Sequence, residues 1–288
     1  MRSGAGKILR LQLRDVRMNE RYLEAGGHRL EYAWWGPPPE QAPTLVFLHE
    51  GLGSVAQWRD FPRQLSEATG FGAFAASRLG YGRSDPVELP RPLRYMHEEA
   101  VLLPEVLSAV GIKEFVLVGH SDGASIAIIY AGSGREPGLK GLILEAPHVF
   151  AEQVGLESIE KARQAFLTTD FPQKLAKYHG ENLQGAFWGW NRAWLDPGFR
   201  SWNLESYLPQ IQVPTLIIQG EDDQFGTMKQ VEAVRSQVRG PVEVLLLPQC
   251  GHSPHRDHPK EVLEVMRAFV KGNQVEGLVS RRGLQQLE

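Results

Sequence analysis

Residues 115–123 read Phe-Val-Leu-Val-Gly-His-Ser-Asp-Gly, a short apolar run that ends in a serine flanked by two glycines. The pattern predicts a strand, a very tight turn and a helix, with Ser121 at the apex of the turn. A turn this sharp forces its central residue into a strained backbone conformation and leaves no room for side chains on either side of it. We therefore expect that Gly119 and Gly123 are glycines for steric reasons. The strain would hold the Ser121 hydroxyl clear of the sheet, where a substrate can reach it.

The composition excludes several classes of function. The 288 residues are 42% hydrophobic and 23% charged with a net charge of −3, so we expect a globular protein without a cationic surface for nucleic acid or anionic membranes. Met1–Glu20 lacks the apolar core of a secretory signal, no apolar run reaches the ~18–20 residues that span a bilayer, and Cys250 is the single cysteine. We therefore expect a soluble cytoplasmic monomer or homodimer that acts on a small molecule.

Strand and helix signals alternate along most of the chain. Strands are predicted at 21–25, 29–35, 44–49, 74–77, 115–119, 141–145, 215–219 and 242–247, with helices at 58–68, 95–110, from Asp122 onward, 227–238 and 259–271. Repeated β-α units of this kind predict an α/β fold with a mainly parallel sheet of the eight-stranded type and helices on both faces.

One interval departs from this alternation. Residues 147–212 carry no strand signal and are too long for a structureless loop, so they are predicted to form short helices at 151–168, 171–179, 183–195 and 200–208. We interpret them as a helical lid inserted into a core formed by residues 20–146 and 213–271. Residues 1–19 and 272–288 are predicted to be terminal extensions, and the C-terminal one is expected to be loosely held.

A serine hydroxyl needs a base within hydrogen-bond reach, and the base needs an acid to orient it. Three acids, Glu221, Asp222 and Asp223, follow the strand at 214–219, and three histidines, His252, His255 and His258, follow the strand at 242–247. Ligand sites of open α/β sheets lie at the carboxyl ends of the strands, so these groups are expected to meet Ser121. The prolines at 254 and 259 break any helical register among the histidines, so no metal site is expected.

The Gly-x-Ser-x-Gly turn and the order serine, acid, histidine resemble the α/β-hydrolase superfamily from about Arg21 to Val270. The resemblance selects Asp223, three residues after a glycine, with Asp222 in reserve. The Gly-His-x-Pro loop selects His252 over His255 and His258. It implies catalysis by Ser121, Asp223 and His252 through an acyl-enzyme, without a cofactor.

A second loop is similar to the oxyanion loop of that superfamily. Residues 49–53 read His-Glu-Gly-Leu-Gly, which implies that the backbone N–H groups of Gly51 and Asp122 form the oxyanion hole. Glu50 stands where glycine is usual, so its carboxylate must point away, pair with a neighbouring arginine or bind a substrate amine. Residues 77–85 are similar to the Arg-Gly-x-Gly-x-Ser loop of the superfamily, with Leu79 where arginine is usual.

The lid sequence bears on the substrate. Phe187, Trp190 and Trp194 are spaced to share one helix face, with Trp188 and Trp202 nearby. This stripe either packs the lid onto the core or forms an aromatic wall over a pocket that would also contain Glu50, Leu52, His148 and Trp188.

The favoured function is hydrolysis of a small apolar or aromatic carboxylic ester or lactone. The alternatives are a carbon–carbon bond hydrolase of ring-cleavage products, an aminopeptidase of the proline-releasing type, and a non-catalytic ligand sensor on the same fold. A serine at 121 argues against dehalogenase or epoxide hydrolase chemistry, for which the superfamily resemblance implies an aspartate nucleophile.

Overall fold

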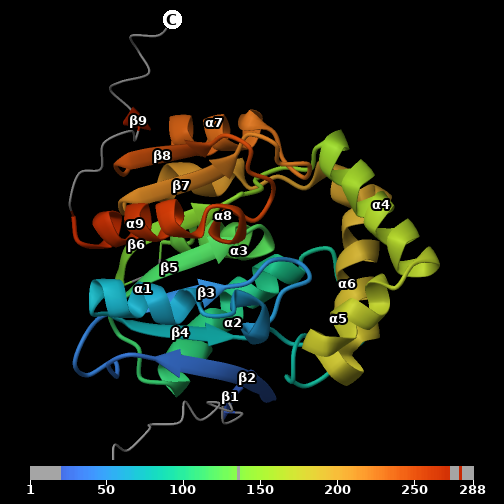
Figure 1. Cartoon of the computed structure of the whole chain (residues 1–288), viewed down its shortest axis with the longest axis horizontal. Helices are drawn as coiled ribbons and strands as arrows, with labels where there is room; N and C mark the ends of the chain where they lie inside the picture. The colour runs from blue at the N-terminus through green and yellow to red at the C-terminus, as the bar shows by residue number, and fades with distance from the viewer. Residues whose placement is uncertain (1–20, 135–136, 273–278, 281–288) are drawn as a thin grey trace, which may run out of the picture.

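One mixed sheet forms the centre of the molecule. The computed structural model describes residues 21–134, 137–272 and 279–280 (Figure 1). Strands β3 to β8 run parallel, whereas β1, β2 and β9 are antiparallel to their neighbours, in the order β1-β2-β4-β3-β5-β6-β7-β8-β9. The strands are β1 (Arg21–Ala25), β2 (His28–Trp35), β3 (Thr44–Leu48), β4 (Gly72–Ala76), β5 (Phe115–His120), β6 (Leu139–Glu145), β7 (Thr215–Gly220), β8 (Val242–Leu247) and β9 (Val279–Ser280).

Helices cover both faces of this sheet, as predicted. Helices α1 and α9 pack together on one face, and α2 packs with α3 on the other (Figure 1). Strand β3 shows the reason: Leu45 and Phe47 belong to one buried layer, and Val46 and Leu48 to the opposite layer, so the four positions after Thr44 are all apolar. The core helices are η1 (Val55–Trp58), α1 (Phe61–Thr69), α2 (Tyr95–Ala109), α3 (Asp122–Gly132), α7 (Met228–Gln237), α8 (Pro254–Asp257) and α9 (Pro259–Val270).

Between β6 and β7 the chain leaves the sheet and forms a separate group of helices at one end of it (Figure 1). Helices α4, α5 and α6, which we call the inserted helices, share an aromatic core in which the rings of Phe166 and Phe187 stack with centroids 3.7 Å apart. The segments are α4 (Gln153–Thr168), α5 (Phe171–His179), η2 (Gly180–Asn182), α6 (Leu183–Leu195), η3 (Pro197–Ser201) and η4 (Glu205–Gln210).

Several boundaries differ from the prediction. The helix predicted at 58–68 begins at Phe61, because Arg59 has a φ of 53° and separates it from η1. The helix predicted at 200–208 is two short 3₁₀ turns, since Trp202 between them has an extended backbone.

The predicted C-terminal extension adds a strand to the sheet. Val279–Ser280 pairs antiparallel with β8, so this part of the tail is held at the sheet edge and the sheet has one strand more than expected. The predicted N-terminal extension lies outside the described residues. In the described part of the chain, no helix is long and apolar enough to cross a membrane.

The turn between β5 and α3 is packed against the carboxyl end of β3. A side-chain carbon at Gly119 would lie 2.5 Å from the carbonyl oxygen of Gly123, and one at Gly123 would lie 1.9 Å from the carbonyl oxygen of Leu48. These contacts are with backbone atoms, which cannot move aside without shifting α3 or β3. Both glycines are therefore required by sterics, as the sequence predicts.

Replacing Gly123 by alanine is expected to lower the free energy of unfolding by at least about 1–3 kcal/mol, because the new methyl group overlaps the end of β3. The matched control is Gly185→Ala in α6, where the nearest atom would lie at an ordinary 3.5 Å from the methyl group and helix propensity favours alanine. Urea unfolding of both variants measures the difference. Equal midpoints for the two variants would show that the elbow tolerates a side chain.

Candidate active site

Ser121 stands at the point where β5 turns into α3. Its backbone has a φ of 54° and a ψ of −117°, a region that non-glycine residues rarely occupy. Its backbone N–H donates to the carbonyl of Glu145 at 2.9 Å, which fixes the turn to the neighbouring strand β6. The side chain is 7% exposed and lines a cavity. The strained turn therefore presents the hydroxyl to this cavity.

His252 and Asp223 meet at the same edge of the sheet. His252 Nδ1 lies 2.9 Å from both carboxylate oxygens of Asp223, and the imidazole lines the cavity together with Ser121. A proton on Nδ1, shared with the carboxylate, leaves Nε2 as the unprotonated nitrogen that accepts a proton. The structure thus brings the three residues that the resemblance selects to the same edge of the sheet, after β5, β7 and β8.

The carboxylate of Asp223 is held by donors from its own loop and strand. The side chain of Gln219, near the end of β7, donates to Oδ2 at 2.9 Å, and the backbone N–H of Phe225 donates to Oδ1 at 2.8 Å. Burial alone would raise the pKa of Asp223, but the charge and hydrogen bond of His252, with the donation from Phe225, lower it to about 2. Asp223 is therefore ionised at neutral pH and orients the imidazole.

The competing acids and bases lie elsewhere. Asp222 is exposed to solvent and does not line the cavity. His255 is buried away from the cavity and pairs through Nδ1 with Glu145 Oε2 at 2.8 Å, while His258 lies 3.6 Å from Glu261. Within residues 21–134, 137–272 and 279–280, no group of three or more His, Cys, Asp or Glu side chains could hold a metal ion.

Arg78 supports the predicted oxyanion loop from behind. Its guanidinium is buried and donates to the carbonyl oxygens of His49 and, at 3.1 Å, Glu50. In a trans peptide the C=O and N–H point in opposite directions, so the N–H of Gly51 points away from Arg78. Gly51 itself lines the cavity. Among the described residues, neither this N–H nor that of Asp122 donates to a backbone acceptor, so both are available for an oxyanion.

Glu50 turns its carboxylate back into the protein. The carboxylate lies 3.5 Å from Arg256 and 3.6 Å from His120, and a side-chain carbon at Gly53 would lie 2.4 Å from Glu50 Oε2. Burial alone would raise the pKa of Glu50, but the close approach of His120 and the charge of Arg256 hold it well below its usual range. Of the three arrangements expected for Glu50, the structure shows the ion pair with a neighbouring arginine, Arg256. His120 lies on the same carboxylate.

A second buried acid connects the turn after Ser121 to the inserted helices. The side chain of Asp122 accepts hydrogen bonds from the Tyr95 hydroxyl and from Trp194 Nε1, the latter at 3.2 Å, and lies 3.9 Å from Arg78. Burial raises the pKa of Asp122, and Arg78 with the two donors opposes this rise. Trp194 lies on α6, so this network attaches the inserted helices to the start of α3.

The cavity in front of Ser121 has a volume of about 220 Å³. Five of the six predicted pocket residues line it, and Trp188 does not. Trp188 Nε1 instead donates to Gln184 at 2.9 Å, because helical spacing turns it away from Trp190 and Trp194. The lining residues are Glu50, Gly51, Leu52, His120, Ser121, His148, Gly155, Ile159, Ala162, Phe171, Trp190, Trp194, Gln224, Phe225, His252 and Ser253.

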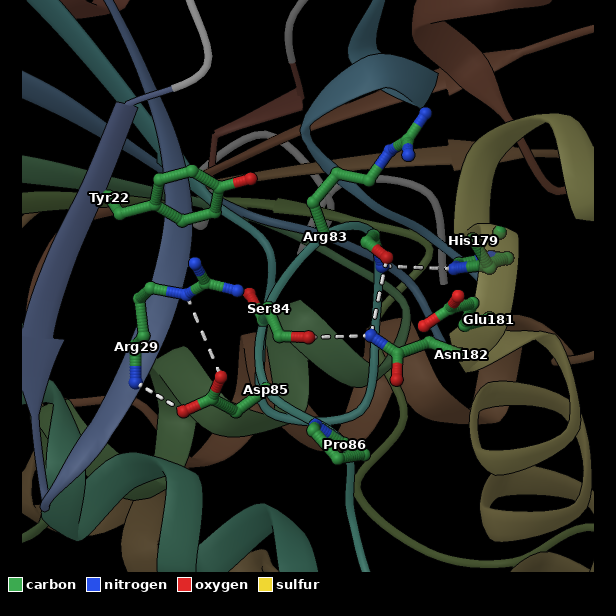
Figure 2. Close-up of a pocket in the computed structure, with 11 residues that line it drawn as sticks. Tyr22, Arg29, Arg83, Ser84, Asp85, Pro86, His179, Glu181 and Asn182 are labelled. Carbon is green, nitrogen blue, oxygen red and sulfur yellow. Dashed lines mark hydrogen bonds and ion pairs between the residues drawn. The ribbon is translucent and has the colours of Figure 1, made fainter.

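A larger cavity of about 440 Å³ lies between the inserted helices and the β1–β2 side of the core (Figure 2). Several polar side chains that line it already have partners within the protein. Arg29 forms an ion pair with Asp85 at 3.7 Å, and Asn182 donates a hydrogen bond to the carbonyl of Ser84 at 2.6 Å. His179 accepts from the backbone N–H of Gly82 at 3.1 Å. Ser121 does not line this cavity, so the smaller cavity is the candidate active site.

Three residues that hold this site were not assigned a role from the sequence. They are Arg78 behind the oxyanion loop, Gln219 against Asp223, and His120, whose Nε2–H donates to the carbonyl of His252 at 2.6 Å. Gln219 and His120 are polar residues near the end of buried apolar strands, which is a signal that sequence reasoning can use.

Comparison with known proteins identifies the family of this chain. The profile of the Alpha/beta hydrolase family matches residues 45–265, which include Ser121, Asp223 and His252. The chain belongs to this family. As an α/β hydrolase it is expected to carry its chemistry at the edge of the sheet where these residues meet.

The relatives of this α/β hydrolase are diverse. Epoxide hydrolase 3 of Xenopus tropicalis is 25% identical over 290 residues, covering 86% of this chain and 76% of that protein. A 2-succinyl-6-hydroxy-2,4-cyclohexadiene-1-carboxylate synthase of Yersinia pestis (strain Pestoides F) is 28% identical over 268 residues, covering 79% of this chain and 87% of that protein. A solved esterase from Exiguobacterium antarcticum, 20% identical, superposes with a TM-score of 0.71 over 88% of this chain and 99% of its own, which shows the shared fold.

His148 provides a pH-dependent test of the cavity wall. Burial, with the neighbouring charge of His252, lowers the pKa of His148 to about 4, against about 6.5 in an unfolded chain. Between these values the unfolded chain binds a proton that the native state excludes, so native stability falls as the pH is lowered. Relative to His148→Gln, the wild type is expected to lose about 2 kcal/mol of unfolding free energy between pH 7 and pH 5.

Urea unfolding of both proteins at the two pH values measures this loss. Parallel pH dependence of the wild type and the variant would contradict the buried, neutral state of His148.

Proposed function

We propose that this α/β hydrolase cleaves small apolar or aromatic carboxylic esters or lactones through a covalent acyl-enzyme on Ser121. The observation that carries the proposal is one cavity lined by Ser121, by His252 bound to the ionised Asp223, and by Gly51. In this proposal these residues supply a nucleophile, its base and a pocket for the substrate carbonyl within one cavity.

The proposed reaction follows from these positions. His252 Nε2 takes the Ser121 proton as Oγ attacks the carbonyl carbon, and the carbonyl π electrons move to the oxygen. The backbone N–H groups of Gly51 and Asp122 donate to that oxyanion. When the carbonyl re-forms, the leaving alkoxide departs with the proton from His252. Water then repeats the sequence and releases the acid.

The size and lining of the cavity support the substrate class. A volume of about 220 Å³ suits a compact acyl group, and Ile159, Phe171 and Phe225 give the walls an apolar character. In this proposal residues 147–212 act as the lid that closes the cavity. A solved enol-lactonase from Burkholderia xenovorans, 18% identical, has the same fold with a TM-score of 0.69 over 87% of this chain and 100% of its own.

The alternatives have weaker support. The carboxylate of Glu50 lies against Arg256 and His120, so it is not free to bind the amine of an aminopeptidase substrate. An epoxide lacks a carbonyl oxygen for the Gly51 and Asp122 amides. Hydrolysis of a carbon–carbon bond beside a ketone uses the same groups and is the second candidate. A ligand sensor would not need the hydrogen bond between His252 and Asp223.

Labelling with a fluorophosphonate tests the nucleophile. We expect stoichiometric modification of the wild type at Ser121, none in Ser121→Ala, and a rate lowered by on the order of 10³-fold in His252→Ala, because the hydroxyl then lacks its base. Mass spectrometry of the intact protein and of its peptides measures the modification. A folded wild type that remains unlabelled would favour the ligand sensor.

A substrate panel tests the bond type. We expect p-nitrophenyl acetate, p-nitrophenyl benzoate and small lactones to be hydrolysed faster than an aminoacyl p-nitroanilide or a ring-cleavage dienoate, because the cavity is compact and Glu50 is already paired. The values of kcat/KM under one set of conditions provide the comparison. Preference for the dienoate would establish the carbon–carbon hydrolase instead.

A further inference from the structure

The edge of one tryptophan fills the space beside Gly51. Trp190 lies on α6, is only 6% exposed and lines the candidate active site. A side-chain carbon at Gly51 would lie 2.2 Å from Trp190 Nε1 and 2.3 Å from Cδ1. The indole N–H edge therefore packs directly on the residue whose backbone amide belongs to the proposed oxyanion hole.

This indole N–H has no acceptor among the described residues. The two neighbouring tryptophans of α6 are satisfied, since Trp188 Nε1 donates to Gln184 and Trp194 Nε1 donates to Asp122. The enclosed N–H groups of Trp58 and Trp202 also lack acceptors, but neither residue lines the cavity. Trp190 is thus a buried residue of the cavity wall with an unsatisfied donor, and a bound molecule would supply the missing acceptor.

Rings four residues apart on α6 contact the two proposed oxyanion residues. Trp190 packs on Gly51, and Trp194 bonds to the side chain of Asp122 at 3.2 Å. Residues separated by four positions lie one above the other on a helix, so one face of α6 spans both halves of the hole. The bond of Trp194 to Asp122 fixes the position of α6, and with it that of the Trp190 N–H.

We propose that Trp190 Nε1–H is a third donor to the oxyanion, supplied by the inserted helices, in addition to the backbone N–H groups of Gly51 and Asp122. The proposal rests on the acyl-enzyme function and goes beyond it. When Ser121 Oγ bonds to the carbonyl carbon, the π electrons move to the oxygen, and Trp190 donates to that negative charge without transferring its proton. A donor that strengthens its bond as charge develops raises kcat more than it lowers KM.

The test compares three substitutions in α6. Trp190→Phe removes the N–H, and replacement of Trp190 by 3-benzothienylalanine exchanges the N–H for sulfur while keeping the bicyclic shape. Trp188→Phe is the matched control, because that residue lies outside the cavity. The readouts are the second-order rate of fluorophosphonate labelling at Ser121 and the kcat and KM for p-nitrophenyl acetate.

We expect both Trp190 variants to lose on the order of 10²-fold in labelling rate and in kcat, with KM changed less than threefold and Trp188→Phe within twofold of wild type. A benzothienyl variant that labels at the wild-type rate would overturn the proposal, since ring shape alone would then suffice. A rise in KM with unchanged kcat would also overturn it, because the N–H would then bind another part of the substrate. An unlabelled wild type would instead refute the proposed function itself.

Discussion

The close contact between the β5–α3 turn and the carboxyl end of β3 is the constraint on which the rest of the site depends. Gly123 lies so near the carbonyl oxygen of Leu48 that no side chain fits between them, and Ser121 is held at a φ of 54° as a result. The same contact places the loop after β3 beside the nucleophile, because that loop begins at the residue after Leu48. The proposed nucleophile and the proposed oxyanion loop are thus positioned by one packing interaction between the start of α3 and the end of β3.

Buried charges then fix the loops that strand packing leaves free. Arg78 holds two successive carbonyls of the oxyanion loop, and the carboxylate of Asp122 ties the start of α3 to α6. Below the imidazole of His252, Glu50 and Glu145 pair with His120 and His255. Such buried groups add little net stability, but removing one partner leaves a costly unpaired charge, so they define a single loop conformation.

The sequence predicts those features that depend on local sterics and on strand order. The glycines around Ser121 follow from a short pattern, and the parallel sheet follows from the repeated alternation of strands and helices. The choice of Asp223 and His252 among three acids and three histidines follows from the resemblance to the superfamily. The fate of Glu50, the outward turn of Trp188 and the support from Arg78 could not be predicted, because each depends on side chains far apart in the sequence. The separation of η1 from α1 at Arg59 depends on a single backbone angle, and the strand at 279–280 depends on pairing at the sheet edge. Neither can be predicted from the local residue pattern.

These observations describe a member of the Alpha/beta hydrolase family whose candidate active site lies at the carboxyl ends of β5, β7 and β8 and is lined in part by helices inserted between β6 and β7. The most direct test is a crystal structure of the covalent phosphonate adduct on Ser121. We expect the phosphoryl oxygen at about 2.7–3.1 Å from the backbone nitrogens of Gly51 and Asp122, with the imidazole of His252 in hydrogen-bond contact with an oxygen of the adduct. An adduct whose oxygen faces away from both amides, or an imidazole that remains out of contact with it, would show that these residues do not form the active site.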